Sequence, residues 1–137
     1  MKKRILLLAL CTIILIAVLT GCSAKATFNV GSDAVDFDNI TVKESYYEYT
    51  PTSDNKLVLA YFSTSASADI NTLTDNFFGK ENIAQLEVNG SNYECKGVSF
   101  ENSTSGMNVV LIFEVPSSAS GNATLTANAL GSISQNI

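Results

Sequence analysis

Short strand-forming segments, separated by turn residues about every ten positions, most constrain the fold of this 137-residue chain. The continuous apolar run 57–62 is bounded by turn residues and has the length of a central strand, and 107–115 is a second long, mostly apolar strand segment. Alternating or β-prone segments lie at 35–43, 46–49, 86–88, 93–95, 98–100 and 123–129. Partial helical spacing occurs only within 69–78; this segment is ambiguous, and one interpretation is one or two helical turns that cross between sheets. The pattern predicts an all-β fold, an antiparallel β-sandwich of about seven to eight strands.

The clearest local signal is an Asn-Gly pair between two of the short strand-forming segments. Asn89 and Gly90 separate 86–88 from 93–95. Asn-Gly tolerates the positive φ angles that the two-residue turns of hairpins require, so a β-hairpin is expected here. Pro116, which cannot donate a hydrogen bond to a neighbouring strand, is expected to end the second long apolar strand.

The beginning of the chain has the composition of an export signal. Lys2, Lys3 and Arg4 precede an apolar stretch at 5–19. As a helix this stretch would be roughly 22 Å long, which is shorter than the ~30 Å hydrocarbon core of a bilayer. We therefore interpret residues 1–21 as a signal-peptide helix that precedes the β domain. The alternative is an uncleaved membrane-spanning helix that ends in a cysteine by chance.

The tetrapeptide Leu19-Thr20-Gly21-Cys22, at the end of the apolar stretch, resembles the lipobox of bacterial lipoproteins. The resemblance implies attachment of a diacylglyceryl group to the thiol of Cys22 and cleavage between Gly21 and Cys22. Two acyl chains anchor a protein stably where a single chain does not. We therefore expect a lipidated Cys22 with a short tether at 22–27 and a folded domain at 28–137. The domain is expected at the cell membrane, on its extracytoplasmic face.

Removal of residues 1–21 changes the charge balance of the chain. Five Lys and thirteen Asp or Glu remain, which gives a net charge of −8, and the remaining chain has no Arg. Binding to nucleic acid needs clustered Lys and Arg, so nucleic acid is excluded as a partner. Anionic lipid head groups are also poor partners for so acidic a domain, and the lipid on Cys22 is expected to supply the attachment.

The chain contains no His, which is the commonest general base and a common metal ligand. Carboxylate pairs such as Glu94 with Glu101, or Asp69 with Asp75, are expected by chance among thirteen acidic residues. We therefore expect no catalytic residue, no metal, no cofactor and no enzymatic activity.

Three tyrosines are the candidate ligand contacts. Tyr46, Tyr47 and Tyr49 lie close together beside Glu44 and Glu48, and Tyr47 and Tyr49 would share one face of a strand. Tyrosine provides contact area at low entropic cost and can stack on sugars. The alternative is a set of ordinary strand tyrosines with half-buried rings.

Two further features admit more than one interpretation. Asp33, Asp36 and Asp38 form a group of oxygen ligands that either binds calcium or lies on a solvated strand face. Cys95 is left without a cysteine partner once Cys11 is removed and Cys22 is lipidated. Cys95 is either a small buried hydrophobic residue or a reactive thiol.

Residues 57–127 resemble the small immunoglobulin-like domains of bacterial lipoproteins that are akin to the mycobacterial immunoprotective extracellular antigen. Three features carry the resemblance: the apolar strand 57–62 with the Ser/Thr-rich loop after it, the hairpin Leu86-x-Val88-x-Gly90-x-x-Tyr93, and Phe113-x-Val115-Pro116. The resemblance implies an immunoglobulin-like topology for the sandwich, and it brings no catalytic residues.

The sequence thus predicts a membrane-anchored, extracytoplasmic lipoprotein that acts as a non-catalytic binding module of the bacterial cell envelope. Its expected partner is a protein or a glycan. The alternative is a small acidic inhibitor or accessory subunit that meets a basic protein and is steered by its negative charge.

Overall fold

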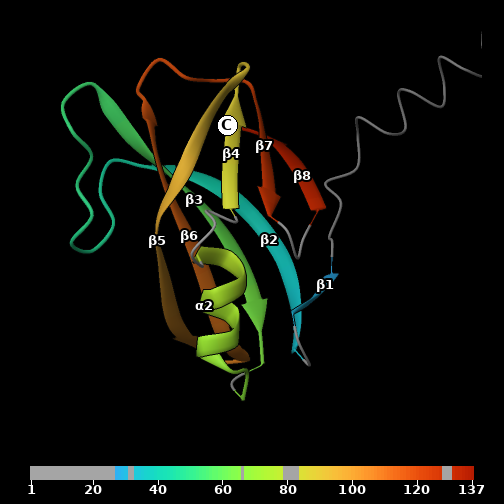
Figure 1. Ribbon diagram of the computed structural model, residues 1–137. Helices are drawn as coiled ribbons and strands as arrows, with labels where there is room; N and C mark the ends of the chain where they lie inside the picture. The colour runs from blue at the N-terminus through green and yellow to red at the C-terminus, as the bar shows by residue number, and fades with distance from the viewer. Residues whose placement is uncertain (1–26, 31–32, 66, 79–83, 128–130) are drawn as a thin grey trace, which may run out of the picture.

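The computed structural model describes residues 27–30, 33–65, 67–78, 84–127 and 131–137 (Figure 1). The interpreted signal peptide, the lipobox with Gly21 and Cys22, and the tether up to residue 26 lie outside the described residues. Within the described residues, no helix is both long enough and apolar enough to cross a membrane.

The described part of the chain is built almost entirely of β-strands, with one short helix, α2 (Ile70–Phe78). The strands are β1 (Thr27–Val30), β2 (Asp33–Lys43), β3 (Asn55–Thr64), β4 (Ala84–Val88), β5 (Ser91–Ser103), β6 (Gly106–Pro116), β7 (Asn122–Ala127) and β8 (Gly131–Asn136). Among the described residues these eight strands form one sheet in the order β1-β2-β3-β6-β5-β4-β7-β8. Every neighbouring pair is antiparallel, as the sequence predicts.

The sheet curls until it is nearly a barrel. The long strand β5 pairs with β4 over its first residues and with β6 beyond Cys95, and the register shifts between Cys95 and Gly97. A bulge of this kind bends a strand and increases its twist. The two ends of the sheet order approach each other where β8 meets β2. The Gln135 side chain of β8 is hydrogen-bonded to both backbone groups of Ile40 on β2. Ile40 N–H donates to Gln135 Oε1 at 2.9 Å, and Gln135 Nε2 donates to the Ile40 carbonyl at 2.8 Å.

This topology does not confirm the immunoglobulin-like sandwich. A sandwich has two separate sheets packed face to face, whereas β5 here carries the hydrogen bonding from one half of the sheet into the other. The sequence predicts the individual strands, but the length and bend of β5 join them into a single curled sheet.

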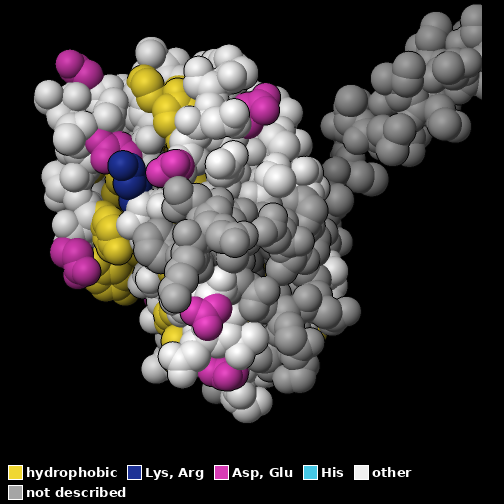
Figure 2. Space-filling model, in the orientation of Figure 1, with side chains coloured by type: hydrophobic (Ala, Val, Ile, Leu, Met, Phe, Trp, Pro, Cys, Tyr) yellow, Lys and Arg dark blue, Asp and Glu magenta, His cyan; other side chains and the backbone are white. Residues whose placement is uncertain are grey.

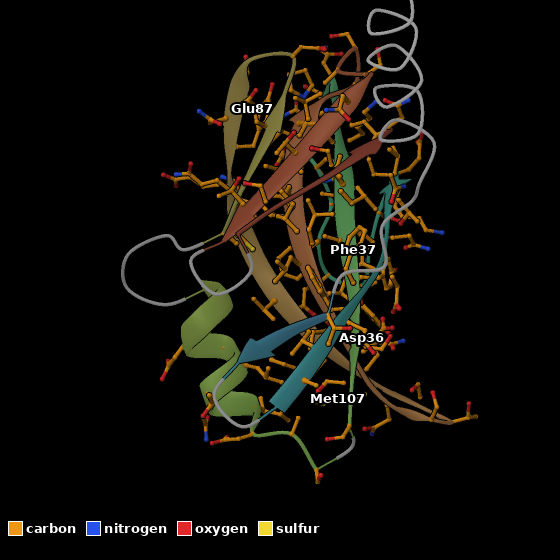
Figure 3. All side chains as sticks on the ribbon, turned by 90° about the vertical axis from the view of Figure 1, so that its right-hand side faces the viewer. Asp36, Phe37, Glu87 and Met107 are labelled. Atoms are coloured by element: carbon orange, nitrogen blue, oxygen red, sulfur yellow. The ribbon has the colours of Figure 1, made fainter. Side chains whose placement is uncertain are left out.

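The main hydrophobic core fills the inside of the curled sheet. Phe62 and Phe113 are its largest fully buried side chains, and Phe37 packs on Phe62 edge to face at 5.5 Å between ring centroids. Along β4, buried Leu86 alternates with exposed Gln85 and Glu87, so one face of the strand points inward (Figure 3). The inward faces of β2 to β8 therefore supply one continuous core.

Helix α2 packs across β5 at the end of the sheet away from the β4–β5 turn (Figure 1). Asp69 caps its first turn, because its carboxylate accepts from Asn71 N–H at 3.0 Å and from the Thr72 hydroxyl at 2.9 Å. The Thr72 bond, followed by the Asn71 bond, lowers the pKa of Asp69. Leu73 is fully buried in the main core. The helical interpretation of 69–78 is confirmed, but the helix does not cross between two sheets, because the described strands form one sheet.

The hairpin predicted from Asn-Gly is also confirmed. Asn89 and Gly90 have φ angles of 52° and 78°, and the register continues from Val88–Ser91 to Gln85–Glu94. Positive φ at both central residues is the property for which Asn-Gly is favoured in such turns. The sequence did not reveal two short edge strands, β1 and β8, which pair with β2 and β7 respectively.

Candidate functional site

The segment between β2 and β3 carries the candidate tyrosines. Residues 44–54 leave the sheet as a long loop, seen at the left of Figure 1, and we call residues 44–50 the tyrosine loop. The sequence predicts a strand here, and that prediction is wrong. Tyr46 and Tyr49 instead close a tight turn, with Tyr46 N–H donating to the Tyr49 carbonyl at 3.0 Å and the reverse bond at 2.9 Å.

The tight turn gives the three tyrosine rings different surroundings. Tyr47 has a φ of 50° at the tip of the turn, and 73% of the residue's surface is exposed. Tyr46 is buried, with 9% of its surface exposed, and Tyr49 is half-buried. The expectation that Tyr47 and Tyr49 share a strand face is therefore wrong, because the chain reverses between them.

Tyr46 belongs to a second apolar cluster on the outer face of the sheet. Leu57 and Leu59 of β3 and Val110 and Ile112 of β6 form this outer cluster with Tyr46. Tyr49 and Tyr61 pack against it. Both faces of β3 and β6 are thus covered in their middle parts, which explains why 57–62 and 109–113 are continuously apolar rather than alternating.

Gly97 on β5 makes room for the tyrosine loop. A Cβ atom at this position would lie 2.2 Å from the hydroxyl oxygen of Tyr49 and 2.7 Å from its Cζ. The ring of Tyr49 therefore rests on bare backbone, at the bulge where β5 bends. Glycine is needed here because of this close approach.

Glu101 on β5 fixes the position of Tyr46. The Tyr46 hydroxyl donates a short hydrogen bond to Glu101 Oε1. Burial raises the pKa of Tyr46, and the bond to Glu101 raises it further. Burial also raises the pKa of Tyr61, with the Glu101 charge as the second cause. Both phenols therefore stay protonated at neutral pH, and Tyr46 acts as a hydrogen-bond donor.

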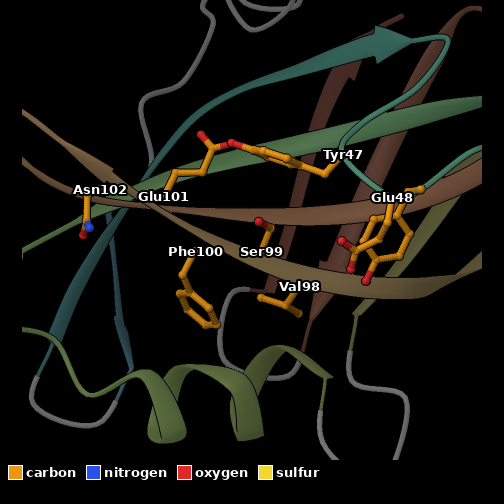
Figure 4. Close-up of a pocket in the computed structure, with 8 residues that line it drawn as sticks. Tyr47, Glu48, Val98, Ser99, Phe100, Glu101 and Asn102 are labelled. Carbon is orange, nitrogen blue, oxygen red and sulfur yellow. The ribbon is translucent and has the colours of Figure 1, made fainter.

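An open groove of about 580 Å³ lies between the tyrosine loop and β5 (Figure 4). Its lining residues are Tyr47, Glu48, Tyr49, Val98, Ser99, Phe100, Glu101 and Asn102. Figure 4 shows Tyr47 and Glu101 pointing toward one another, with Glu48 and Asn102 at opposite ends. The Tyr47 ring packs on Tyr46 at 4.7 Å between centroids and at 79° between planes. The exposed ring is therefore supported from below by a buried one.

Glu114 on β6 binds the end of the long loop 44–54, where the chain enters β3. Its Oε1 accepts from Thr52 N–H at 2.8 Å, from the Thr52 hydroxyl at 2.6 Å and from Asn55 Nδ2 at 2.8 Å. The Asn55 bond, followed by the two Thr52 bonds, lowers the pKa of Glu114 to about 2. An ionised Glu114 thus binds the C-terminal end of the loop 44–54 to the sheet.

The acidic segment of β2 is engaged with neighbouring strands. Asp36 accepts from the Thr27 hydroxyl at 2.5 Å, and Asp38 accepts from the Ser63 hydroxyl. The register shifts between Phe37 and Asn39, next to Asp38. In the part of the chain that the structure describes, no three Asp, Glu, Cys or His side chains are grouped as metal ligands.

Cys95 lies in the main core at the bend of β5. Only 9% of its surface is exposed, and its Sγ donates to the Gly97 carbonyl at 3.2 Å. Burial raises the pKa of the Cys95 thiol to about 11, so the reactive thiolate is suppressed at neutral pH. The structure thus favours the buried interpretation of Cys95.

Of the three candidate tyrosines, the structure brings Tyr47 and Tyr49 to the groove and places Tyr46 beneath it. The sequence analysis missed Glu101, Ser99 and Gly97 as their partners on β5. The alternation of β5 could have put these three residues on one face, but it gives no sign of which loop would cover that face.

The charge around the groove is negative. Glu48 and Glu101 are its two charged lining residues, and Figure 2 shows acidic side chains outweighing basic ones on the face in view. No family model matches the chain, and comparisons with curated proteins and with solved structures found no match. The arrangement can offer an aromatic face, two carboxylates and neutral hydrogen-bonding groups to a ligand in solution.

Proposed function

We propose that this protein is a lipid-anchored, extracytoplasmic binding module of a bacterial cell envelope, and that it is not an enzyme. The lipobox sequence 19–22 supports the anchor on Cys22 and the location at the membrane. The mature charge of −8, from five basic and thirteen acidic residues, argues against nucleic acid as the partner. The absence of His from the sequence supports the non-catalytic assignment.

The observation that carries the binding function is the position of Tyr47. The residue is 73% exposed, yet its ring is held at the tip of a hydrogen-bonded turn and packed on the buried ring of Tyr46. Tyrosine is enriched in binding interfaces because a rigid ring supplies contact area at low entropic cost. A pre-positioned aromatic ring beside a groove is therefore the element we assign to ligand contact.

The proposed relationship to the immunoglobulin-like lipoprotein domains would supply a scaffold of similar size but no site residues. The binding proposal is therefore independent of it, since the groove depends on the tyrosine loop and on β5.

The binding function is tested by partner capture from envelope extract with the lipidated protein as bait. Tyr47→Ala is expected to abolish capture and leave the thermal midpoint unchanged, because the ring is mostly exposed. Ile70→Ala is the matched control, since Ile70 is another exposed apolar side chain, on α2. Unchanged capture by Tyr47→Ala would contradict the assignment of the site.

The anchor is tested separately with Cys22→Ser. This variant should lose incorporation of labelled palmitate and accumulate as uncleaved precursor, because the thiol that accepts the lipid is gone. Normal labelling and normal cleavage of Cys22→Ser would contradict the lipoprotein assignment.

A second candidate function is a small acidic inhibitor or accessory subunit of a basic protein. The observation that favours it is the excess of acidic residues in the mature sequence. Capture by such a mechanism should weaken steeply as salt rises, because exposed charges more than a Debye length apart are screened. Capture that is flat between low and high salt would remove this candidate.

A further inference from the structure

We propose that the groove between the tyrosine loop and β5 binds one cationic side chain, a lysine or an arginine, of a protein partner. This inference rests on the proposed binding function and names the chemistry that the site recognises. Tyr47 would provide the aromatic face and Glu101 the opposing charge, and Glu48 would add negative charge at the other end of the groove.

The first argument is the sign of the charge in the groove. Both charged residues among its eight lining residues are acidic, and all eight belong to the described part of the chain. The basic residue Lys43 lines two other hollows, one together with Tyr61 and one together with residues 50–56. A cation entering the groove therefore meets negative charge from its lining, whereas an anion would be repelled.

The second argument is the hydrogen bonding of Glu101. The Tyr46 hydroxyl donates to Oε1 and thereby fixes the orientation of the carboxylate. A carboxylate has two oxygens and about four acceptor sites, so Glu101 keeps capacity for another donor. An ammonium or guanidinium group has only donors to offer, and it matches a carboxylate that is already positioned.

The third argument is the aromatic ring on the other side of the groove. A cation within about 6 Å of the centroid of a tyrosine ring is attracted to the face of that ring. Figure 4 shows the hydroxyl end of Tyr47 directed toward Glu101, so a cation beside the carboxylate would lie at the edge of the Tyr47 ring, and its side chain would extend from there over the ring face. The Tyr47 ring packs on the Tyr46 ring, and the Tyr46 hydroxyl is hydrogen-bonded to Glu101. The positions of the aromatic ring and of the carboxylate therefore depend on each other through Tyr46.

Neutral glycans are the competing ligand class, and they make a different demand on the site. A sugar stacked on Tyr47 would also donate its hydroxyls to the carboxylates of Glu48 and Glu101. The ligand class is therefore separated by changing the charge of the ligand, and the groove variants identify the contacts.

The experiment uses saturation-transfer NMR on the full chain as the cell processes it, in zwitterionic nanodiscs. The probes are three capped pentapeptides, Gly-Ser-X-Ser-Gly, where X is lysine, arginine or Nε-acetyl-lysine. Chitotriose is the neutral glycan probe. We expect transfer to the side-chain protons of lysine and arginine, and at least tenfold weaker binding of the acetylated peptide, which has lost its charge.

Variants of the groove identify the contacts. Tyr47→Leu should weaken binding of the lysine peptide about two- to fivefold, whereas Tyr47→Phe should retain it because the aromatic face remains. Glu101→Gln should weaken it about two- to fivefold. Glu87→Gln is the matched control, since it removes the same charge from an exposed position on β4 (Figure 3), and it should change binding little.

Each outcome bears on a different part of the reasoning. Equal binding of the acetylated and charged peptides, or no saturable transfer to either charged peptide, overturns the cation assignment. Binding of chitotriose that is lost in Tyr47→Leu overturns the cation assignment but leaves the binding module standing. Envelope capture that is independent of Tyr47 overturns the proposed site itself.

Discussion

Replacement of Gly97 by Ala tests how the tyrosine loop is held against the sheet. The new methyl group would lie 2.2 Å from the Tyr49 hydroxyl oxygen and 2.7 Å from Cζ, whereas ordinary contacts begin near 3.4 Å. The ring must therefore retreat by about 1 Å at its far end. The backbone is not the obstacle, because Gly97 is not among the glycines with positive φ.

The size of the effect follows from overpacking. Insertion of a methyl group into a packed site costs typically about 1–3 kcal/mol, and we expect about 1–2 kcal/mol because Tyr49 is only half-buried. In a Tyr49→Ala background the aromatic ring that a methyl group at position 97 would meet is absent. There Gly97→Ala should be neutral or stabilising, because glycine within a strand is worth about 0.5–1 kcal/mol less than alanine.

Urea denaturation followed by circular dichroism measures the four corners of this cycle, the parent chain, the two single variants and the double variant. The coupling free energy between positions 97 and 49 should be at least about 1 kcal/mol. Tyr49→Phe should relieve only part of the clash, since Cζ remains at 2.7 Å. If Gly97→Ala costs the same in both backgrounds, Tyr49 does not rest on Gly97 and the proposed wall of the groove is wrong.

Four further predictions concern the scaffold. Three hydrogen bonds lower the pKa of Glu114 from its ordinary value of 4.5 to about 2. The ionised Glu114 therefore stabilises the folded state fully above pH 4.5, and this contribution to the free energy of unfolding is lost as the pH falls through 2. Glu114→Gln should therefore flatten the acid branch of the stability–pH curve, and an unchanged branch would contradict this role. Gln135→Ala should cost about 1–3 kcal/mol in urea denaturation, because it removes both bonds to Ile40 and leaves buried polar groups unsatisfied. Leu73→Ala should cost about 2–5 kcal/mol, since the Leu73 side chain of α2 is fully buried in the main core; a cost below about 1 kcal/mol would mean that the helix is not docked. Cys95 should react with iodoacetamide at pH 8 only as fast as the domain unfolds, and rapid labelling of the native protein would show an accessible thiol.

The strands that the sequence predicts best are those whose patterns are local. The apolar runs 57–62 and 107–115 lie within β3 and β6, and Asn89-Gly90 forms the turn between β4 and β5. Partial helical spacing within 69–78 located α2. These elements are predictable because strand length, turn φ angles and helical spacing depend on neighbouring residues. The edge strands β1 and β8 were missed, since neither carries a comparable apolar pattern in the sequence.

The tyrosine loop shows where local patterns stop being informative. Tyr46-Tyr47-Glu48-Tyr49 is β-prone in sequence, yet it forms a tight turn that covers the outer cluster on β3 and β6. Tertiary packing overrode propensity here, because the turn buries Tyr46 in the outer cluster on β3 and β6. Strand propensity therefore identified three tyrosines as a group but assigned them the wrong conformation.

The sequence by itself determined an acidic composition without His, and it predicted most of the antiparallel strands; the export signal with a lipobox stays a prediction from the sequence. Only the tertiary structure decided that β5 bends to join those strands into one curled sheet, and that Gly97 and Glu101 meet the tyrosine loop. The physical reason is distance along the chain. Tyr46 and Glu101 are separated by 55 positions, and contacts of that range depend on sheet order and register, which local side-chain patterns do not specify.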